Sequence, residues 1–193
     1  MSQQKSGSER LEAFSDGVFA VVITVLVLDL RPPEAATLGG LLRLWPVGLS
    51  YAVSYLFIAI VWVNHHHLLR YAEKPTLRLV WGNFAHLFSV SLMPFSTAWI
   101  ASTRMAPVPV AVYATVLLLV NATYLGLCRE AVDRDESEVV PMRARHMMRM
   151  RSTMTMAVFG VAAIVSLKYP MAGVALICCC LFVYVQPGVP GTA

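Results

Sequence analysis

Asp16 is the clearest candidate for chemistry in this chain, because it places a carboxylate where apolar residues prevail. It lies just before the run 18–28, in which every side chain except that of Thr24 is apolar. A charged group inside a membrane-spanning helix costs about 2.5 to 3.5 kcal/mol on insertion scales, so it normally faces protein or water and often marks a functional site. Asp16 is therefore expected either to form hydrogen bonds inside a helix bundle or to anchor a functional helix.

A second polar cluster is rich in histidine. A metal site is the obvious hypothesis, but consecutive residues on a helix point about 100° apart, so three adjacent histidines cannot converge on one ion unless the helix breaks. We therefore expect no metal site, and predict that these side chains supply hydrogen bonds to Asp16 and to neighbouring backbone groups. The residues concerned are Asn64, His65, His66, His67, Asn83 and His86.

An enzyme is not expected, although Ser15 adjoins Asp16 and histidines occur elsewhere in the chain. No GxSxG nucleophile elbow or comparable arrangement accompanies that serine. The four cysteines, Cys128 and the run 178–180, show no CxxC spacing and lie in apolar stretches. Neither a zinc cage nor a disulfide framework is indicated, and no resident cofactor is expected.

The composition places these residues in a membrane. The chain has 193 residues, of which 58% are hydrophobic and 13% charged, whereas soluble domains average about a quarter charged residues. A chain this short leaves much of its surface exposed, so it cannot hide that many apolar side chains from water. We infer that lipid solvates most of its surface.

Six apolar windows are long enough to be membrane-spanning helices, given that about 20 helical residues cross a bilayer core. Pro94 is expected to kink the third window, and a tight helical hairpin is expected between the last two. The prediction is one all-α, multi-pass membrane domain over residues 1–193. The windows are 11–30, 44–63, 79–100, 108–127, 152–167 and 169–185.

Lysine and arginine counts predict the orientation, because short cytoplasmic loops are enriched in them. Eleven fall on the side of the N-terminus and four on the opposite side, so both termini are expected in the cytoplasm. The net charge of +4 belongs mostly to a segment beside the membrane, which favours contact with lipid headgroups over nucleic-acid binding. The eleven are Lys5, Arg10, Arg70, Lys74, Arg78, Arg129, Arg134, Arg143, Arg145, Arg149 and Arg151, and the four are Arg31, Arg43, Arg104 and Lys168.

Helical spacing in the first window separates an apolar stripe from Asp16. At 100° per residue, Phe14, Val21, Val25 and Leu28 share one side of the helix, and Asp16 lies well away from it. One helix thus combines a polar anchor with an apolar seam. From spacing alone, the seam is equally consistent with ordinary core packing.

The opening helix resembles that of the transmembrane protein 175 family, the lysosomal and endosomal potassium channels and their prokaryotic relatives. The resemblance rests on Arg10 and on Phe14, Ser15 and Asp16, followed by GVFAVVITVLVLDL. It covers roughly the first 100 residues with specific motifs and the remainder by helix count only. Further matching residues are Trp62, His65, His66, Asn83, Leu92, Met93, Pro94 and Phe95.

The resemblance implies a six-helix subunit that assembles as a homotetramer, with the first helix lining a central pore. By position, Val21, Val25 and Leu28 correspond to apolar rings of that pore, and Thr24 to a polar ring. The family's apolar rings are commonly isoleucine or leucine, so the valines are a departure. No TVGYG-like carbonyl ladder is present to strip water from potassium, so selectivity has to come from the first helix.

We therefore expect a potassium-permeable cation channel in the cytoplasmic membrane, with modest selectivity for potassium over sodium. Its partners are monovalent cations, membrane lipids and other copies of itself. Asp29 is placed at the non-cytoplasmic pore mouth, although a salt bridge to Arg31 is an equal possibility. The residues expected to hold the first helix in place are Arg10, Phe14, Ser15, Asp16, His65, His66 and Asn83.

The alternative from a different functional class is a secondary or proton-coupled transporter. In that case Asp16 and the histidines 65–67 form a proton relay, since ionisable residues inside membranes commonly serve that purpose. A membrane scaffold that conducts nothing is the third possibility.

Overall fold

The computed structural model describes residues 2–70, 76–133 and 142–185, and every regular element within them is helical. This confirms the predicted all-α class. The elements are α1 (Ser2–Leu28), α2 (Leu38–Leu42), α3 (Trp45–Arg70), α4 (Leu77–Ser91), α5 (Met93–Ser102), α6 (Pro107–Cys128), the π-helical turn η1 (Arg129–Asp133), α7 (Met142–Ser166) and α8 (Pro170–Val185).

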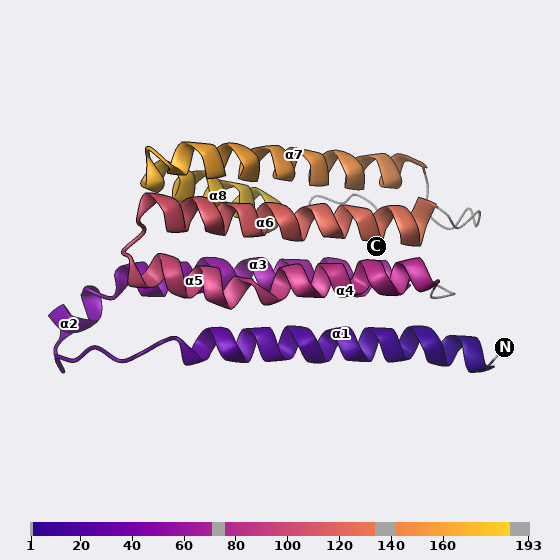
Figure 1. Ribbon diagram of the computed structural model, residues 1–193, viewed down its shortest axis with the longest axis horizontal. Helices are drawn as coiled ribbons and strands as arrows, with labels where there is room; N and C mark the ends of the chain where they lie inside the picture. Colours follow the sequence, from indigo (N-terminus) through magenta and orange to yellow (C-terminus); the bar gives the residue numbers. More distant parts are fainter. Residues whose placement is uncertain (1, 71–75, 134–141, 186–193) are drawn as a thin grey trace.

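The long helices lie side by side and alternate in direction (Figure 1). Helix α1 forms one edge of the bundle and α7 the opposite edge, with α3 to α6 between them. Helix α1 contacts α3, α4 and α5, whereas α7 packs on α6 and α8. The start of α1 and the C-terminal ends of α3 and α6 lie at the same end of the bundle.

Four segments of the described chain are long and apolar enough to cross a membrane: Gly7–Leu28, Trp45–Arg70, Leu77–Ser102 and Pro107–Ala131. They agree with the first four predicted windows. Helices α7 and α8 occupy the other two windows, but α7 begins in an arginine-rich stretch and α8 has only 16 residues. A multi-pass membrane protein is therefore supported, and the count of six spans stays a prediction.

Pro94 interrupts the third span as expected. Helix α4 ends at Ser91, Leu92 lies in a turn, and α5 begins with Met93 and has the proline in its first turn. Proline has no backbone N–H and its ring clashes with the preceding turn, so the continuous helix breaks at this point. The two helices still follow one another across the bundle (Figure 1).

Two tight turns reverse the chain at the other end of the bundle. After α5, Arg104 and Met105 adopt positive φ angles of 51° and 62°, and the Met105 N–H donates to the Ile100 carbonyl at 2.9 Å. Between α7 and α8, Gly173 approaches Ser166 so closely that a Cβ atom would collide with the serine hydroxyl. The predicted hairpin between the last two helices is thus present, and the absence of a side chain at Gly173 allows α8 to approach α7 closely at this point.

A buried polar cluster ties the middle helices together. The Ser54 hydroxyl of α3 lies 2.7 Å from Thr97 Oγ1 of α5 and 2.8 Å from the Tyr113 hydroxyl of α6. Lipid tails are as apolar as leucine, so helices in a membrane associate through close packing and such interhelical hydrogen bonds rather than through the hydrophobic effect.

The short helix α2, capped by Thr37, was not expected from the sequence.

Candidate functional site: the two faces of α1

One face of α1 packs against the rest of the subunit. Ser15, Phe19, Val22 and Leu26 are almost fully buried, and their spacing of four, three and four residues places them on one side of the helix. Their neighbours are helices α3, α4 and α5. This face fixes the rotation of α1 and thereby determines which residues point away from the subunit.

The opposite face carries all four residues that the sequence assigned to the pore. Val21, Val25 and Leu28 are 59%, 42% and 77% exposed, and Thr24 is also exposed. In the single subunit α1 forms one edge of the bundle (Figure 1), so this face is not covered by the other described helices. Exposed apolar side chains on a helix in a membrane face lipid or another subunit.

Thr24 is oriented in a way that suits a cation. Its hydroxyl donates to the Val21 carbonyl at 2.8 Å, which consumes the only hydroxyl hydrogen. The oxygen lone pairs stay available on the exposed face, where they can accept a hydrogen bond or approach a cation. Asp29, predicted at the pore mouth, lies just beyond the end of α1 and is exposed.

Asp16 is held by a tryptophan rather than by the histidines. The indole Nε1 of Trp62, on α3, donates to Asp16 Oδ1 at 2.8 Å. The expectation that the histidine cluster directly satisfies Asp16 is therefore wrong. Trp62 belongs to the motif that carried the family resemblance, but nothing in helical spacing indicated that its N–H reaches a carboxylate 46 residues away.

A buried chain of hydrogen bonds connects α1 to α4 and α3. Asn83 Nδ2 donates to the Ser15 hydroxyl at 2.9 Å, and this hydroxyl donates to the Leu11 carbonyl at 2.8 Å. Asn83 Oδ1 lies 2.7 Å from His65 Nε2, so the network assigns the hydrogen on that ring to Nε2. Ser15, His65 and Asn83 were all predicted site residues, and the structure brings them together.

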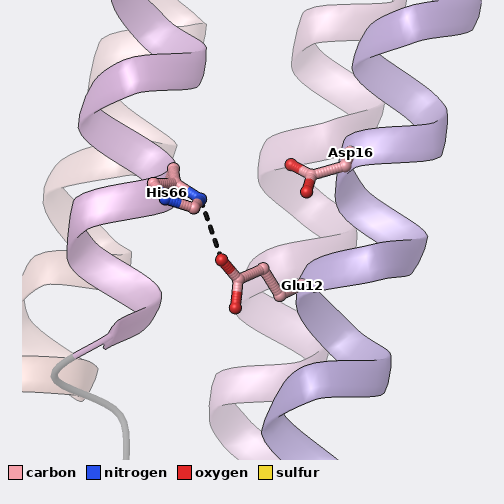
Figure 2. Close-up of side chains that lie close together, drawn as sticks. All are labelled: Glu12, Asp16 and His66. Carbon is pink, nitrogen blue, oxygen red and sulfur yellow. Dashed lines mark ion pairs between the residues drawn. The ribbon is translucent and has the colours of Figure 1, made fainter.

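The three consecutive histidines point in different directions, as the helical geometry predicted. His65 is buried and stacks on His86, with ring centres 5.6 Å apart and planes 8° apart. His67 is exposed and its Nδ1 lies 2.7 Å from the Val63 carbonyl. His66 faces α1, where its Nδ1 lies 2.8 Å from Glu12 Oε1 (Figure 2). No single ion can be bound by all three.

Glu12 was not among the predicted site residues, although its spacing from Asp16 contained the signal. The two carboxylates are four residues apart and therefore project from the same side of α1 toward α3 (Figure 2). The predicted Phe14 packs on Phe84 of α4, with ring centres 5.4 Å apart. Arg10 is exposed and forms no ion pair with this network among the described residues.

The first half of the chain matches a known family. The family model described as endosomal/lysosomal potassium channel TMEM175 matches residues 10–94, a range that includes every predicted site residue. A protein of Chryseobacterium sp. (strain P1-3), named a potassium channel, is 40% identical over 129 residues, which are 67% of each chain. This chain belongs to the TMEM175 family. The resemblance found in the sequence motifs is thereby confirmed.

Other TMEM175 relatives extend the likeness beyond the motifs. A protein of Chamaesiphon minutus, named a potassium channel, is 35% identical over 141 residues, 68% of this chain and 70% of its own. The crystal structure of a lysosomal potassium-selective channel TMEM175 homolog from Chamaesiphon minutus superposes with a TM-score of 0.80 at 27% identity. It covers 93% of this chain and 97% of its own, so the helical arrangement is shared along nearly the whole length. A family of ion channels agrees with the expectation that the chain is not an enzyme.

Proposed function

We propose that this protein is a potassium-permeable cation channel of the cytoplasmic membrane, assembled from four identical chains around a pore lined by α1. TMEM175 relatives that are 35% and 40% identical are named potassium channels. The single observation that carries the pore assignment is the division of α1 into an anchored face and an exposed apolar face. The exposed apolar face has no partner within the described chain. In this proposal it is covered when copies of α1 from other subunits meet around the pore.

The exposed face has the chemistry of a hydrophobic constriction. Val21 and Leu28, with Val25 between them, are seven positions apart, or about 10 Å of pore axis at roughly 1.5 Å per helical residue. Fourfold rings of such side chains oppose wetting, so a cation passes only by losing part of its hydration shell. Potassium holds its water less tightly than sodium, and this difference yields a modest preference for potassium.

Leu28 is the strongest candidate for the narrowest point. It is the largest of the three apolar side chains and the most exposed. Valines at 21 and 25 reach less far toward an axis than the isoleucine or leucine expected from the resemblance. Thr24 lies between the rings, where four hydroxyl oxygens replace part of the water that the ion has lost.

The hydrogen-bond network acts as the anchor of the pore helix. Asn83 donates to Ser15 and Trp62 donates to Asp16, while Phe14 packs on Phe84. Glu12 and His66 add an ionic contact when the imidazole is protonated. Each bond on this face constrains the rotation of α1 and hence the position of Val21, Val25 and Leu28. In this proposal, Arg10 contributes at the same end of the helix.

The proposed topology has six spans with both termini in the cytoplasm. The long helices alternate in direction, and the start of α1 shares an end of the bundle with the ends of α3 and α6, next to which most basic residues lie (Figure 1). The positive-inside rule then assigns that end to the cytoplasm. Asp29 falls at the opposite end, where a ring of carboxylates concentrates cations.

A proton-coupled transporter is the second candidate, favoured by one observation. His65 Nδ1 and His86 Nε2 are buried and have no hydrogen-bond partner among the described residues. Buried ring nitrogens of this kind can bind and release protons. The relay through residues 65–67 loses support, because His67 points away and contacts its own helix backbone.

Recordings from purified protein in planar bilayers separate the two candidates. A channel produces discrete single-channel current steps with potassium, and the current continues without a proton gradient. A transporter produces slow, saturable flux that collapses when the proton gradient is removed. The absence of unitary steps, together with gradient-dependent flux, would refute the channel proposal.

A further inference from the structure

Three potential metal ligands from two helices meet at one end of the bundle. Glu12 and Asp16 on α1 and His66 on α3 each offer one ligand atom, and these atoms lie within 4.8 Å of one another. Figure 2 shows the two carboxylates projecting from α1 toward the imidazole across the gap between the helices. None of the three belongs to the exposed face of α1 that carries the proposed constriction.

The ligand set suits a transition metal better than magnesium or calcium. Imidazole nitrogen is a typical ligand of zinc, copper, iron and nickel, whereas magnesium and calcium take oxygen ligands. Zinc binds nitrogen and oxygen at about 2.0 to 2.2 Å, so two ligands of one tetrahedral ion lie about 3.4 Å apart. His66 Nδ1 lies 2.8 Å from Glu12 Oε1, and the three ligand atoms all lie within 4.8 Å of one another, so small side-chain rotations bring them to these positions.

The surroundings orient these ligands. Trp62 donates its indole N–H to Asp16 Oδ1 at 2.8 Å, which fixes the carboxylate and leaves Oδ2 available. The same indole stacks on the His66 ring, with centres 5.6 Å apart and planes 25° apart. Partners of this kind, which hold ligands in position, commonly raise metal affinity 10- to 100-fold.

The site is accessible and its nitrogen is unoccupied. The side chains of His66 and Glu12 are 25% and 27% exposed, so an ion can enter and can keep water in its remaining positions. His66 Nδ1 lies 2.8 Å from Glu12 Oε1 but forms no directed hydrogen bond among the described residues, so in the neutral ring its lone pair is available to an ion.

We infer that Glu12, Asp16 and His66 form a binding site for a divalent first-row transition-metal ion, with Zn²⁺ as the probe of choice. The ion bridges α1 and α3 through three protein ligands and completes its coordination with water. This revises the sequence prediction of no metal site. That prediction excluded a site built from three consecutive histidines, and the structure agrees, because His65 and His67 point in other directions than His66. The site inferred here uses one histidine and two carboxylates instead.

The test is Zn²⁺ titration of purified full-length protein in detergent, in competition with a chromophoric chelator. The expected result is one saturable site per chain that a thousand-fold excess of Mg²⁺ does not displace. His66→Gln and Glu12→Gln should each weaken binding at least about 10-fold, and Trp62→Phe should weaken it by a similar factor through the loss of the positioning N–H.

Matched controls come from residues of the same types outside the site. His67, which contacts its own helix backbone, and the exposed Glu34, which lies beyond the C-terminal end of α1, carry the same chemical groups, so His67→Gln and Glu34→Gln should bind Zn²⁺ as the wild type does. Size-exclusion profiles identify any variant that fails to fold. If His66→Gln fails to fold, Glu12→Gln alone provides the test. Equal Zn²⁺ affinity in the wild type, His66→Gln and Glu12→Gln would overturn the inference. The assay measures no ion flux, so its outcome is independent of the proposed channel function.

Discussion

The two edge helices of the subunit, α1 and α7, expose similar apolar side chains but are attached in different ways. Leu28 on α1 is 77% exposed and Ile164 on α7 is 73% exposed. Helix α1 is joined to its neighbours through Ser15 and Asp16, which form hydrogen bonds with other helices. In contrast, the hydroxyls of Thr153 and Ser166 on α7 donate to carbonyls of α7 itself.

This difference teaches that exposure alone does not identify a functional face in a membrane protein. Lipid accepts any apolar side chain, so an exposed leucine on α7 needs no explanation. The buried polar groups of α1 fix its rotation about its own axis. Such fixing is expected where the residues on the opposite face must point in a defined direction. This contrast supports the proposal that α1 lines the pore and that α7 contacts lipid.

The largest effect is expected from breaking the anchor of α1. Asn83→Ala removes the partner of both Ser15 and His65 and leaves their buried polar groups unsatisfied, at about 1 to 3 kcal/mol for each group. We expect a loss of about 2 to 4 kcal/mol in the free energy of unfolding, measured by denaturant titration in detergent.

The matched control for that variant lies on the other edge. Thr153→Ala on α7 removes an exposed hydroxyl that bonds only to its own helix, and should change stability by less than about 0.5 kcal/mol. Equal losses from the two variants would remove the distinction between the edges.

A somewhat smaller loss is expected at the hairpin of α7 and α8. Gly173→Ala forces a Cβ atom against the Ser166 hydroxyl and the Ala162 carbonyl, an overpacking that typically costs about 1 to 3 kcal/mol. The double variant with Ser166→Ala should recover part of that loss, because the closest atom is gone. A potassium-to-sodium permeability ratio that changes with Gly173→Ala would contradict the assignment of α7 to the lipid-facing edge.

Substitutions at Asp16 and Trp62 should lower the free energy of unfolding by less than Asn83→Ala does. Trp62→Phe keeps an aromatic ring beside His66 but removes the donor to Asp16, and Asp16→Ala removes the acceptor. Because this bond is partly exposed, each change should cost about 1 kcal/mol and reduce the yield of assembled oligomer, measured by size-exclusion chromatography. Normal assembly combined with altered ion preference would contradict the role of Asp16 as an anchor.

The smallest energetic effect is expected on ion preference. Leu28→Ser replaces an apolar ring by hydroxyls, which lowers the dehydration barrier more for sodium than for potassium. We expect the potassium-to-sodium permeability ratio to fall a few-fold, which corresponds to roughly 1 kcal/mol or less, in reversal-potential measurements. Ile164→Ser on α7 should leave the ratio unchanged.

Periodicity predicted those features that depend on one helix at a time. The stripe of Val21, Val25 and Leu28 follows from 100° per residue, and the break after Ser91 follows from the covalent geometry of Pro94. Both depend only on neighbouring residues, so one sequence suffices to predict them. Asn83 was expected to supply hydrogen bonds because it is a polar residue inside an apolar span, and the family resemblance then placed it among the residues that hold the first helix.

The contacts between helices were harder to predict. The partner of Asp16 is Trp62, and the partner of His66 is Glu12, because of how α1 and α3 are rotated against each other. Helix rotation depends on the packing of Phe19, Val22 and Leu26, which is a property of the assembled bundle.

Cysteine accessibility at Leu28 tests the central claim most directly. In a background with the native cysteines replaced by serine, Leu28→Cys and Ile164→Cys are recorded before and after a charged methanethiosulfonate reagent is added. We predict that the reagent blocks potassium current through Leu28→Cys and leaves current through Ile164→Cys unchanged. Complete labelling of Leu28→Cys without any change in current would contradict a pore on this face of α1.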